Sequence, residues 1–314
     1  MRATTLATAS LLLLAAPALA QDWALPRLEK SPRHHEWAAV KSGDRTVQTF
    51  VAYPQSAAKS TAVIVIHENR GLTDWARGVA DQLAEAGYIA LAPDLLSGAG
   101  PEGGRTKDFA SSDAAREAIS KLTPDQVTAD LDAVAAYALK LPASNGKLAV
   151  GGFCWGGGQT LRYATHNKDL AAAFVFYGAF DHTKEQLAAI AAPVHGFYAG
   201  NDERINATIP ATAALMKELG KTYEPVTYEG AGHGFMRGGE DPQGTEADRK
   251  AREKAWERCS KGSSLRAPRE QRRSTSPSRH HFAAGFAPLE PALPASAAIS
   301  SPAAASAASR NDSL

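Results

Sequence analysis

A cysteine stands among glycines where an apolar run leads into a helix-compatible segment. Residues 147–158 read Lys-Leu-Ala-Val-Gly-Gly-Phe-Cys-Trp-Gly-Gly-Gly, and residues 159–166 favour a helix. This is the strand–turn–helix context of the Gly-x-Ser-x-Gly nucleophile turn, with Cys154 in the serine position. Glycines permit a tight turn, and a helix N-terminus favours a thiolate. We therefore predict that Cys154 is a nucleophile; the alternative is a buried cysteine between close-packed glycines.

An acid and a histidine follow Cys154 in the order of an α/β-hydrolase triad. Asp202 follows an apolar segment that ends in Gly-Asn, and His233 lies between two glycines after another strand-like segment. In such a triad His233 would remove the thiol proton and later protonate the leaving group, while a buried Asp202 would orient the imidazole. Taken singly, Asp202 could be an ordinary turn residue and His233 an ordinary loop histidine.

Between about Trp37 and Trp256 the sequence resembles the dienelactone hydrolase family. The resemblance rests on five segments: Gly152–Gly157, His67-Glu68, Ala92–Leu95, Asp202 and Gly232–Arg237. It implies an α/β-hydrolase fold and a Cys154–His233–Asp202 triad. It further implies that Glu68 lies beside the thiol and helps to control its protonation, and that the backbone N–H groups of Trp155 and Asn69 form an oxyanion hole. The alternative for Glu68 is a helix-capping or salt-bridging surface residue.

The sequence departs from the family at one substrate-binding position. Dienelactone-specific members carry an arginine a few residues beyond the Pro-Asp-Leu segment, where this chain has Gly98. The second carboxylate-binding arginine of the family is matched by Arg237. Arg70 or Arg105 could replace the missing one, although we expect both to be solvated surface charges. The resemblance therefore implies the type of reaction better than the substrate.

The chain divides into three zones by composition. Residues 1–20 combine an early positive charge, a short apolar run and Ala-Leu-Ala, which predicts a secretory signal peptide cleaved near Ala20. We therefore expect a periplasmic or secreted protein. Residues 21–258 have the size of one α/β domain. Residues 259–314 are rich in Ser, Ala, Pro and Arg, without apolar periodicity, and interrupt the helix predicted over residues 246–258. They are either a disordered extension or the product of a reading-frame error.

Composition excludes several functional classes. The net charge of the 314-residue chain is +1, which disfavours binding to nucleic acids or acidic lipids. The two cysteines, Cys154 and Cys259, are expected to be free thiols, because one disulfide would be a poor scaffold for this domain and would consume the nucleophile. His67-Glu68 and His34-His35 lack further ligands at metal-binding spacings, so we expect no metal or other cofactor. We also expect a monomer.

Alternating strand and helix patterns predict a doubly wound, mostly parallel sheet with helices on both faces. The expected strands span residues 36–41, 46–53, 61–66, 88–92, 147–153, 172–177, 194–198 and 224–228, and the first two form a hairpin. Active sites of such sheets lie beyond the carboxyl ends of the strands, where Glu68, Cys154, Asp202 and His233 all fall.

Together these features predict an exported cysteine hydrolase of small esters or lactones, which acts through a thioester acyl-enzyme. A serine-hydrolase mechanism is disfavoured because no Gly-x-Ser-x-Gly segment occurs. The alternative from another class is a binding protein that kept the fold and lost some or all of its activity. Gly98 and the altered C-terminus would fit such a loss.

Overall fold

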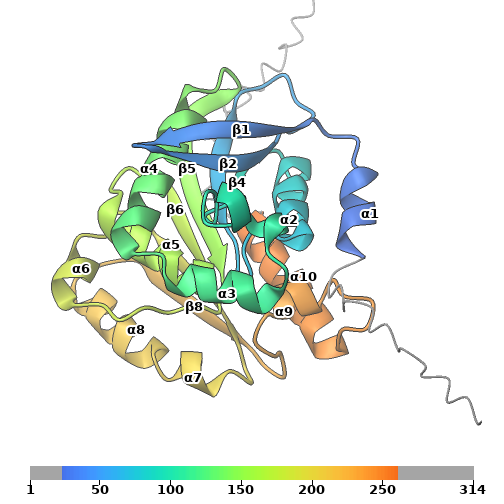
Figure 1. The fold of residues 1–314 in the computed structure, drawn as a ribbon. Coiled ribbons are helices and arrows are strands. Elements are labelled where there is room, and N and C mark those ends of the chain that lie inside the picture. Colours follow the sequence, from blue (N-terminus) through green and yellow to red (C-terminus); the bar gives the residue numbers. More distant parts are fainter. Residues whose placement is uncertain (1–22, 261–314) are drawn as a thin grey trace, which may run out of the picture. The chain divides into compact units, whose positions relative to one another are not determined.

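The computed structural model describes residues 23–260, whose centre is one eight-stranded sheet (Figure 1). The strand order is β1-β2-β4-β3-β5-β6-β7-β8. The strands are β1 (His35–Ser42), β2 (Arg45–Ala52), β3 (Ser60–Ile66), β4 (Ile89–Pro93), β5 (Ser144–Phe153), β6 (Ala172–Phe176), β7 (Val194–Ala199) and β8 (Tyr223–Tyr228). All eight predicted strands are present, with ends shifted by three residues or fewer.

The hairpin and the parallel strands form different parts of the sheet. β1 and β2 pair antiparallel in register from His35 opposite Ala52 to Ser42 opposite Arg45, and β2 lies antiparallel to β4. The strands from β4 through β3 to β8 pair with one another only in parallel. The residues of β3 and β4 are all buried, as expected for strands covered on both faces.

Helices cover both faces of the sheet and form two apolar layers with it (Figure 1). One layer packs α1 (Ala24–Glu29), α2 (Asp74–Glu85) and α10 (Glu246–Ser260) against the sheet. The other layer packs α4 (Pro124–Lys140), α5 (Trp155–His166) and α8 (Ile209–Glu218). The predicted doubly wound architecture is therefore confirmed. The remaining helices are short: α3 (Ser112–Ser120), α6 (Lys184–Ala188), α7 (Glu203–Asn206) and α9 (Phe235–Gly238).

Helix α10 continues two residues beyond its expected end. It includes Cys259 and Ser260, and the Cys259 thiol is buried against the sheet at 6% exposure. The polar sequence Cys-Ser-Lys suggested a stop, but burial of the thiol and a bond from the Ser260 hydroxyl to the Trp256 carbonyl at 2.6 Å extend the helix. The predicted signal peptide, and the predicted tail from residue 261 onward, lie outside the described residues.

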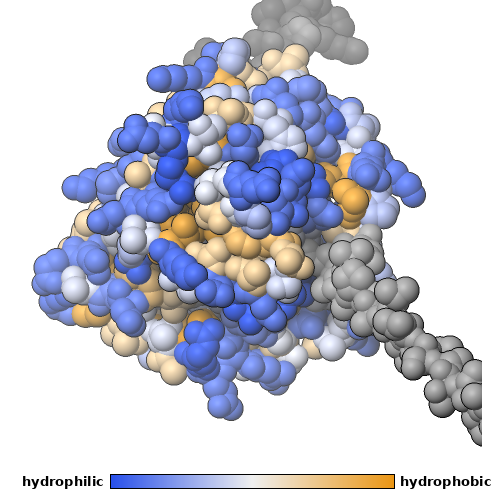
Figure 2. Space-filling view, viewed as in Figure 1, coloured by the Kyte–Doolittle hydropathy of each residue, from blue (hydrophilic) through white to orange (hydrophobic). Residues whose placement is uncertain are grey.

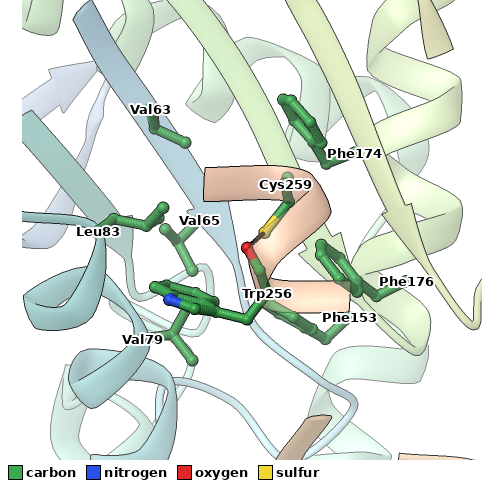
Figure 3. A pocket seen from close by; sticks show the side chains of 10 residues that line it. Val63, Val65, Val79, Leu83, Phe153, Phe174, Phe176, Trp256 and Cys259 are labelled. Atoms are coloured by element: carbon green, nitrogen blue, oxygen red, sulfur yellow. Dashed lines mark hydrogen bonds between the residues drawn. The ribbon is translucent and has the colours of Figure 1, made fainter. Parts of the chain in front are cut away.

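A small apolar cavity of about 30 Å³ lies between the sheet and the two helices α2 and α10 (Figure 3). Val63, Phe174 and Trp256 are among its lining side chains, together with Cys259, whose thiol donates to the Trp256 carbonyl at 3.4 Å. A space of this size holds about one water molecule and offers it no polar partners beyond the helix.

Within residues 23–260, no helix is both long and apolar enough to cross a bilayer.

Candidate active site

Cys154 occupies a strained turn between β5 and α5. Its backbone has φ 55° and ψ −117°, a region that side-chain-bearing residues rarely adopt. The glycines around it permit close backbone approach: a Cβ on Gly152 would lie 2.3 Å from the Gly156 carbonyl oxygen, and a Cβ on Gly156 would lie 2.4 Å from the Ile66 carbonyl oxygen. The Cys154 N–H donates to the Phe176 carbonyl at 3.0 Å. The turn therefore holds a half-buried thiol at the end of the sheet.

His233 and Asp202 are joined directly. The His233 Nδ1 atom lies 2.5 Å from Asp202 Oδ2, and the Asp202 side chain is 7% exposed. The other Asp202 oxygen, Oδ1, accepts from the Ile205 N–H at 3.4 Å, because Asp202 also caps α7. Asp202 is thus a capping residue and the partner of His233 at once. Since Nδ1 is occupied, Nε2 of His233 is the nitrogen left for the Cys154 thiol.

The surroundings of His233 favour its charged form. Its interaction with the Cys154 side chain, together with the bond to Asp202, raises the pKa of His233 to about 9 despite partial burial. The imidazole is therefore protonated at neutral pH. A histidine in this state holds a proton ready for a leaving group.

Glu68 pairs with Arg237 in the interior of the site. Arg237 Nε donates to Glu68 Oε2 at 2.9 Å, and the Glu68 side chain is 8% exposed. Glu68 therefore forms a salt bridge, as the alternative interpretation of this residue expected, but it does so in a buried position and not at the surface. The same ion pair occupies one edge of the Arg237 guanidinium, so a substrate carboxylate would have to share or replace Glu68 there.

The other arginines differ in their surroundings. The Arg105 guanidinium stacks on the Trp37 ring at 3.7 Å from its centroid, which ties it to β1. Arg70 is half-buried and forms no ion pair with any described residue. Gly98 adopts φ 77°, and its N–H donates to the Gly104 carbonyl at 2.8 Å, within the loop after β4. Among the described residues, nothing lies within 4 Å of where its Cβ would be.

The two expected oxyanion donors have N–H groups free of competing acceptors within residues 23–260. Trp155 is the first residue of α5, so its N–H has no acceptor within the helix. Asn69 lies in the turn after β3, and its N–H donates to no acceptor in the part of the chain that the structure describes. Both turns lie at the same edge of the sheet, because β3 and β5 are parallel neighbours with Ile66 opposite Gly152.

Tyr177 belongs to this site although the sequence did not single it out. It follows β6 with φ 38°, is fully buried, and contacts the His233 ring edge to face with centroids 5.2 Å apart. Its hydroxyl has no hydrogen-bond partner among the described residues. Burial and the charges of Glu68 and Cys154 raise its pKa well above the ordinary value, so the phenol stays neutral. The one feature of the sequence that could have indicated Tyr177 is its place as an aromatic residue at the end of a predicted parallel strand.

Helix α3 lies over the nucleophile turn. Its residues Ala115 and Ile119 form a small apolar cluster with Leu96, against which the Trp155 side chain packs. On the face viewed in Figure 2, apolar surface lies between the positions of α2 and α3 and is bordered by hydrophilic side chains. Among residues 23–260, no group of three or more His, Cys, Asp or Glu side chains is placed to hold a metal ion.

The profile of the dienelactone hydrolase family matches residues 47–261, more than half of the chain. The chain belongs to the dienelactone hydrolase family. Among its relatives is a "putative carboxymethylenebutenolidase" of Methylorubrum extorquens, 33% identical over 203 residues, or 61% of this chain and 69% of that protein. Another of the same name, from Escherichia coli, is 34% identical over 211 residues, or 63% of this chain and 76% of that protein.

Solved structures agree with this assignment. The "putative dienelactone hydrolase" from Klebsiella pneumoniae superposes with a TM-score of 0.64 at 27% identity, over 72% of this chain and 96% of that one. The α/β-hydrolase fold expected from the sequence is thereby confirmed. As a member of this family the chain is a hydrolase that acts on carboxylic ester or lactone bonds.

Proposed function

We propose that this dienelactone hydrolase family member cleaves small esters or lactones by nucleophilic catalysis through Cys154. The observation that carries the proposal is the alignment of three side chains at one edge of the sheet. The Cys154 thiol sits on a strained turn and interacts with His233, whose Nδ1 lies 2.5 Å from the buried Asp202 carboxylate. The nucleophile, the base and the acid that orients the base thus follow one another in space, in the order that a catalytic triad requires.

In the first half of the proposed reaction, the Cys154 sulfur attacks the substrate carbonyl carbon as a thiolate, whose proton His233 already holds as an imidazolium. The carbonyl oxygen becomes an oxyanion, which the N–H groups of Trp155 and Asn69 stabilise. The carbon–oxygen bond to the leaving group then breaks, and His233 donates its proton to the departing alkoxide. The products of this half are an alcohol, or the ring-opened hydroxyl of a lactone, and a thioester on Cys154.

In the second half, water attacks the thioester carbon. His233, now neutral, removes a proton from this water, and Asp202 stabilises the imidazolium that forms. A second oxyanion forms in the same place, the carbon–sulfur bond breaks, and the carboxylic acid leaves. The enzyme returns to its initial protonation state.

The Glu68–Arg237 pair bears on the charge state of the Cys154 thiol and on the charge of the substrate that the site accepts. We propose that the charge of Glu68 disfavours the Cys154 thiolate, and that the protonated His233 compensates for this effect. Arg237 offsets part of this charge from 2.9 Å. With Gly98 in place of the second arginine and Arg237 engaged by Glu68, the site should accept neutral esters and favour carboxylated ones modestly.

We further propose that the protein is exported. The apolar run and the Ala-Leu-Ala of residues 1–20 support this proposal. Mass spectrometry of the mature protein tests it, because cleavage near Ala20 would remove the N-terminal segment.

Comparison of the two cysteines tests the mechanism. Cys154→Ala should abolish hydrolysis of a neutral aryl ester, while Cys259→Ala should keep it, because Cys259 is buried in the core away from the candidate site. Mass spectrometry of quenched wild-type protein should find the substrate's acyl group on the peptide that carries Cys154. A folded Cys154→Ala protein with undiminished turnover would exclude a cysteine nucleophile.

A further inference from the structure

His67 connects the end of β3 to two neighbouring loops from a fully buried position. Its Nδ1 lies 2.8 Å from the Glu68 carbonyl oxygen, and its Nε2 lies 3.3 Å from the Leu95 backbone nitrogen. A carbonyl can only accept and a backbone N–H can only donate, so Nδ1 carries the proton and Nε2 accepts. Burial lowers the pKa of His67, which keeps the ring in this neutral form.

The bond to the Glu68 carbonyl fixes the direction of a neighbouring N–H. The Glu68 carbonyl and the Asn69 N–H belong to one trans peptide unit, in which the C=O and N–H bonds point in opposite directions. His67 Nδ1–H therefore holds this unit from its carbonyl side, and the Gly71 N–H adds a second bond to the same oxygen at 3.3 Å. The Asn69 N–H is left facing away from His67, without an acceptor in the described part of the protein.

The same imidazole contacts the residue that carries the second donor. Its ring stacks on the Trp155 indole, with centroids 5.6 Å apart and planes inclined by 18°. Trp155 supplies the first N–H of α5, directly after Cys154. One buried side chain thus touches the Glu68–Asn69 peptide on one side and Trp155 on the other.

A polar network holds the loop after β4, which supplies the Leu95 N–H to His67. The Asp94 carboxylate accepts from the Thr106 hydroxyl at 2.6 Å and from the Thr106 N–H at 3.1 Å. The Thr106 hydroxyl oxygen accepts in turn from the Leu72 N–H at 3.0 Å. The loop after β4, which supplies Leu95 to His67, is thereby tied to the turn that contains Asn69.

We propose that His67 is a positioning residue that aligns the two backbone N–H donors of the oxyanion hole. The inference rests on the proposed function, since it assumes that an oxyanion forms beside Trp155 and Asn69. His67 does not touch the substrate. It acts by fixing one peptide unit through a hydrogen bond and the first residue of α5 through ring stacking.

Two amide substitutions separate the bonds of His67. In a His67→Asn variant the new side-chain amide nitrogen would reach the place of Nδ1, so it can still donate to the Glu68 carbonyl. A His67→Gln amide reaches the place of Nε2 and can accept from Leu95 but no longer holds the Glu68 carbonyl. We expect kcat for an aryl ester to fall about 10- to 100-fold in His67→Gln, with KM unchanged, because loss of one oxyanion donor costs about 10²–10³ in kcat. The fall should be smaller in His67→Asn, which loses the stacking on Trp155 but keeps the hydrogen bond to the Glu68 carbonyl.

A reaction without an oxyanion provides the internal control. Alkylation of Cys154 by iodoacetamide forms no tetrahedral oxyanion, so its rate should be the same in His67→Gln, His67→Asn and wild type. An aldehyde inhibitor that adds to Cys154 forms one, so it should bind more weakly to His67→Gln than to His67→Asn or wild type. His166→Gln, at an exposed histidine paired with Asp132 at 2.8 Å, is the matched histidine control and should change none of these values.

The outcomes separate the inference from the proposed function. If wild type forms no acyl-enzyme on Cys154, the proposed function is wrong. If it does, and folded His67→Gln retains full kcat or loses alkylation and turnover equally, the positioning role is wrong. Should both His67 variants fail to fold, Thr106→Val weakens the network from its outer end. We then expect kcat to fall about 3- to 10-fold at constant alkylation rate, since small displacements of catalytic groups slow reactions strongly; an unchanged kcat would overturn the inference.

Discussion

At the scale of single residues, the candidate site uses conformations and charges that the rest of the fold must hold in place. A non-glycine residue at φ 55°, as at Cys154, costs on the order of 1–3 kcal/mol and persists only where its surroundings determine it. Tyr177, at φ 38°, is a second such residue, and it contacts the His233 ring. The strain is therefore concentrated around the thiol and the imidazole.

The protonation of His233 should depend on its two neighbours. Because the Cys154 interaction is the largest cause of the raised pKa, titration of the His233 ring by NMR should give about 9 in wild type and a lower value in Cys154→Ala. Asp202→Asn should lower it as well. His195, whose pKa is lowered by burial, serves as the internal reference, and its pKa should be the same in all three proteins.

The same pKa predicts how stability varies with pH. A histidine whose pKa is raised by folding stabilises the protein fully below its unfolded pKa of 6.5, and this contribution disappears as the pH rises through about 9. The difference in unfolding free energy between wild type and His233→Gln should therefore shrink from pH 6 to pH 10. A difference that grows over this range would contradict the assignment.

At the scale of elements, glycine contacts bring α5 onto the sheet. A Cβ on Gly157 would lie 2.6 Å from the Phe176 carbonyl oxygen, and one on Gly158 would lie 2.5 Å from the Ala179 carbonyl oxygen. Only glycine permits this approach, which places the N-terminus of α5 directly behind the nucleophile. The position of α5, and with it the position of the Trp155 N–H, therefore depends on the absence of a side chain at Gly157 and Gly158.

Two adjacent glycines of β5 should respond oppositely to substitution. Gly151 lines the apolar cavity, and a Cβ on it would meet the Phe174 Cβ at 3.4 Å, an ordinary contact. Gly151→Ala should stabilise the protein by about 0.5–1 kcal/mol, the usual advantage of alanine over glycine within a strand. Gly152→Ala, whose Cβ would lie 2.3 Å from a backbone oxygen, should destabilise it by about 1–3 kcal/mol. Urea unfolding measures both; loss of stability in Gly151→Ala would show that the cavity cannot take a methyl group.

At the scale of the described part of the chain, one buried carboxylate joins elements distant in sequence. Glu240, after α9, has a side chain that is 6% exposed and accepts from Arg252 of α10 at 3.0 Å, from Gln82 of α2 at 3.1 Å and from Arg27 of α1 at 3.2 Å. It therefore links the helices of one face of the sheet to the segment that carries His233 and Arg237.

Removal of this carboxylate should destabilise the protein more than removal of an exposed one. Glu240→Ala would leave the largely buried Arg252 without its ion-pair partner, and loss of one partner of a buried pair costs about 3–5 kcal/mol. Glu218, which pairs with Lys184 at the surface, is the matched control, and its replacement by alanine should cost at most about 1 kcal/mol. Equal effects of the two substitutions on the urea midpoint would mean that Glu240 is as solvated as Glu218.

The sequence by itself determined the local features of this protein. Alternating apolar patterns located the eight strands, and the glycines around Cys154 predicted the turn, because strand periodicity and turn chemistry depend on residues close in the chain. The continuation of α10 past residue 258 was missed because burial of Cys259, which favours it, depends on the sheet beneath the helix.

Only the tertiary structure decided which distant side chains meet. Glu68 and Arg237 were both named from the sequence, but their pairing across 169 positions was not. The stacking of Arg105 on Trp37, and the place of His67 between the Glu68 carbonyl and Trp155, were equally hidden. A side chain's partner is set by where parallel strands and their loops come together, and no periodicity in the sequence encodes that contact.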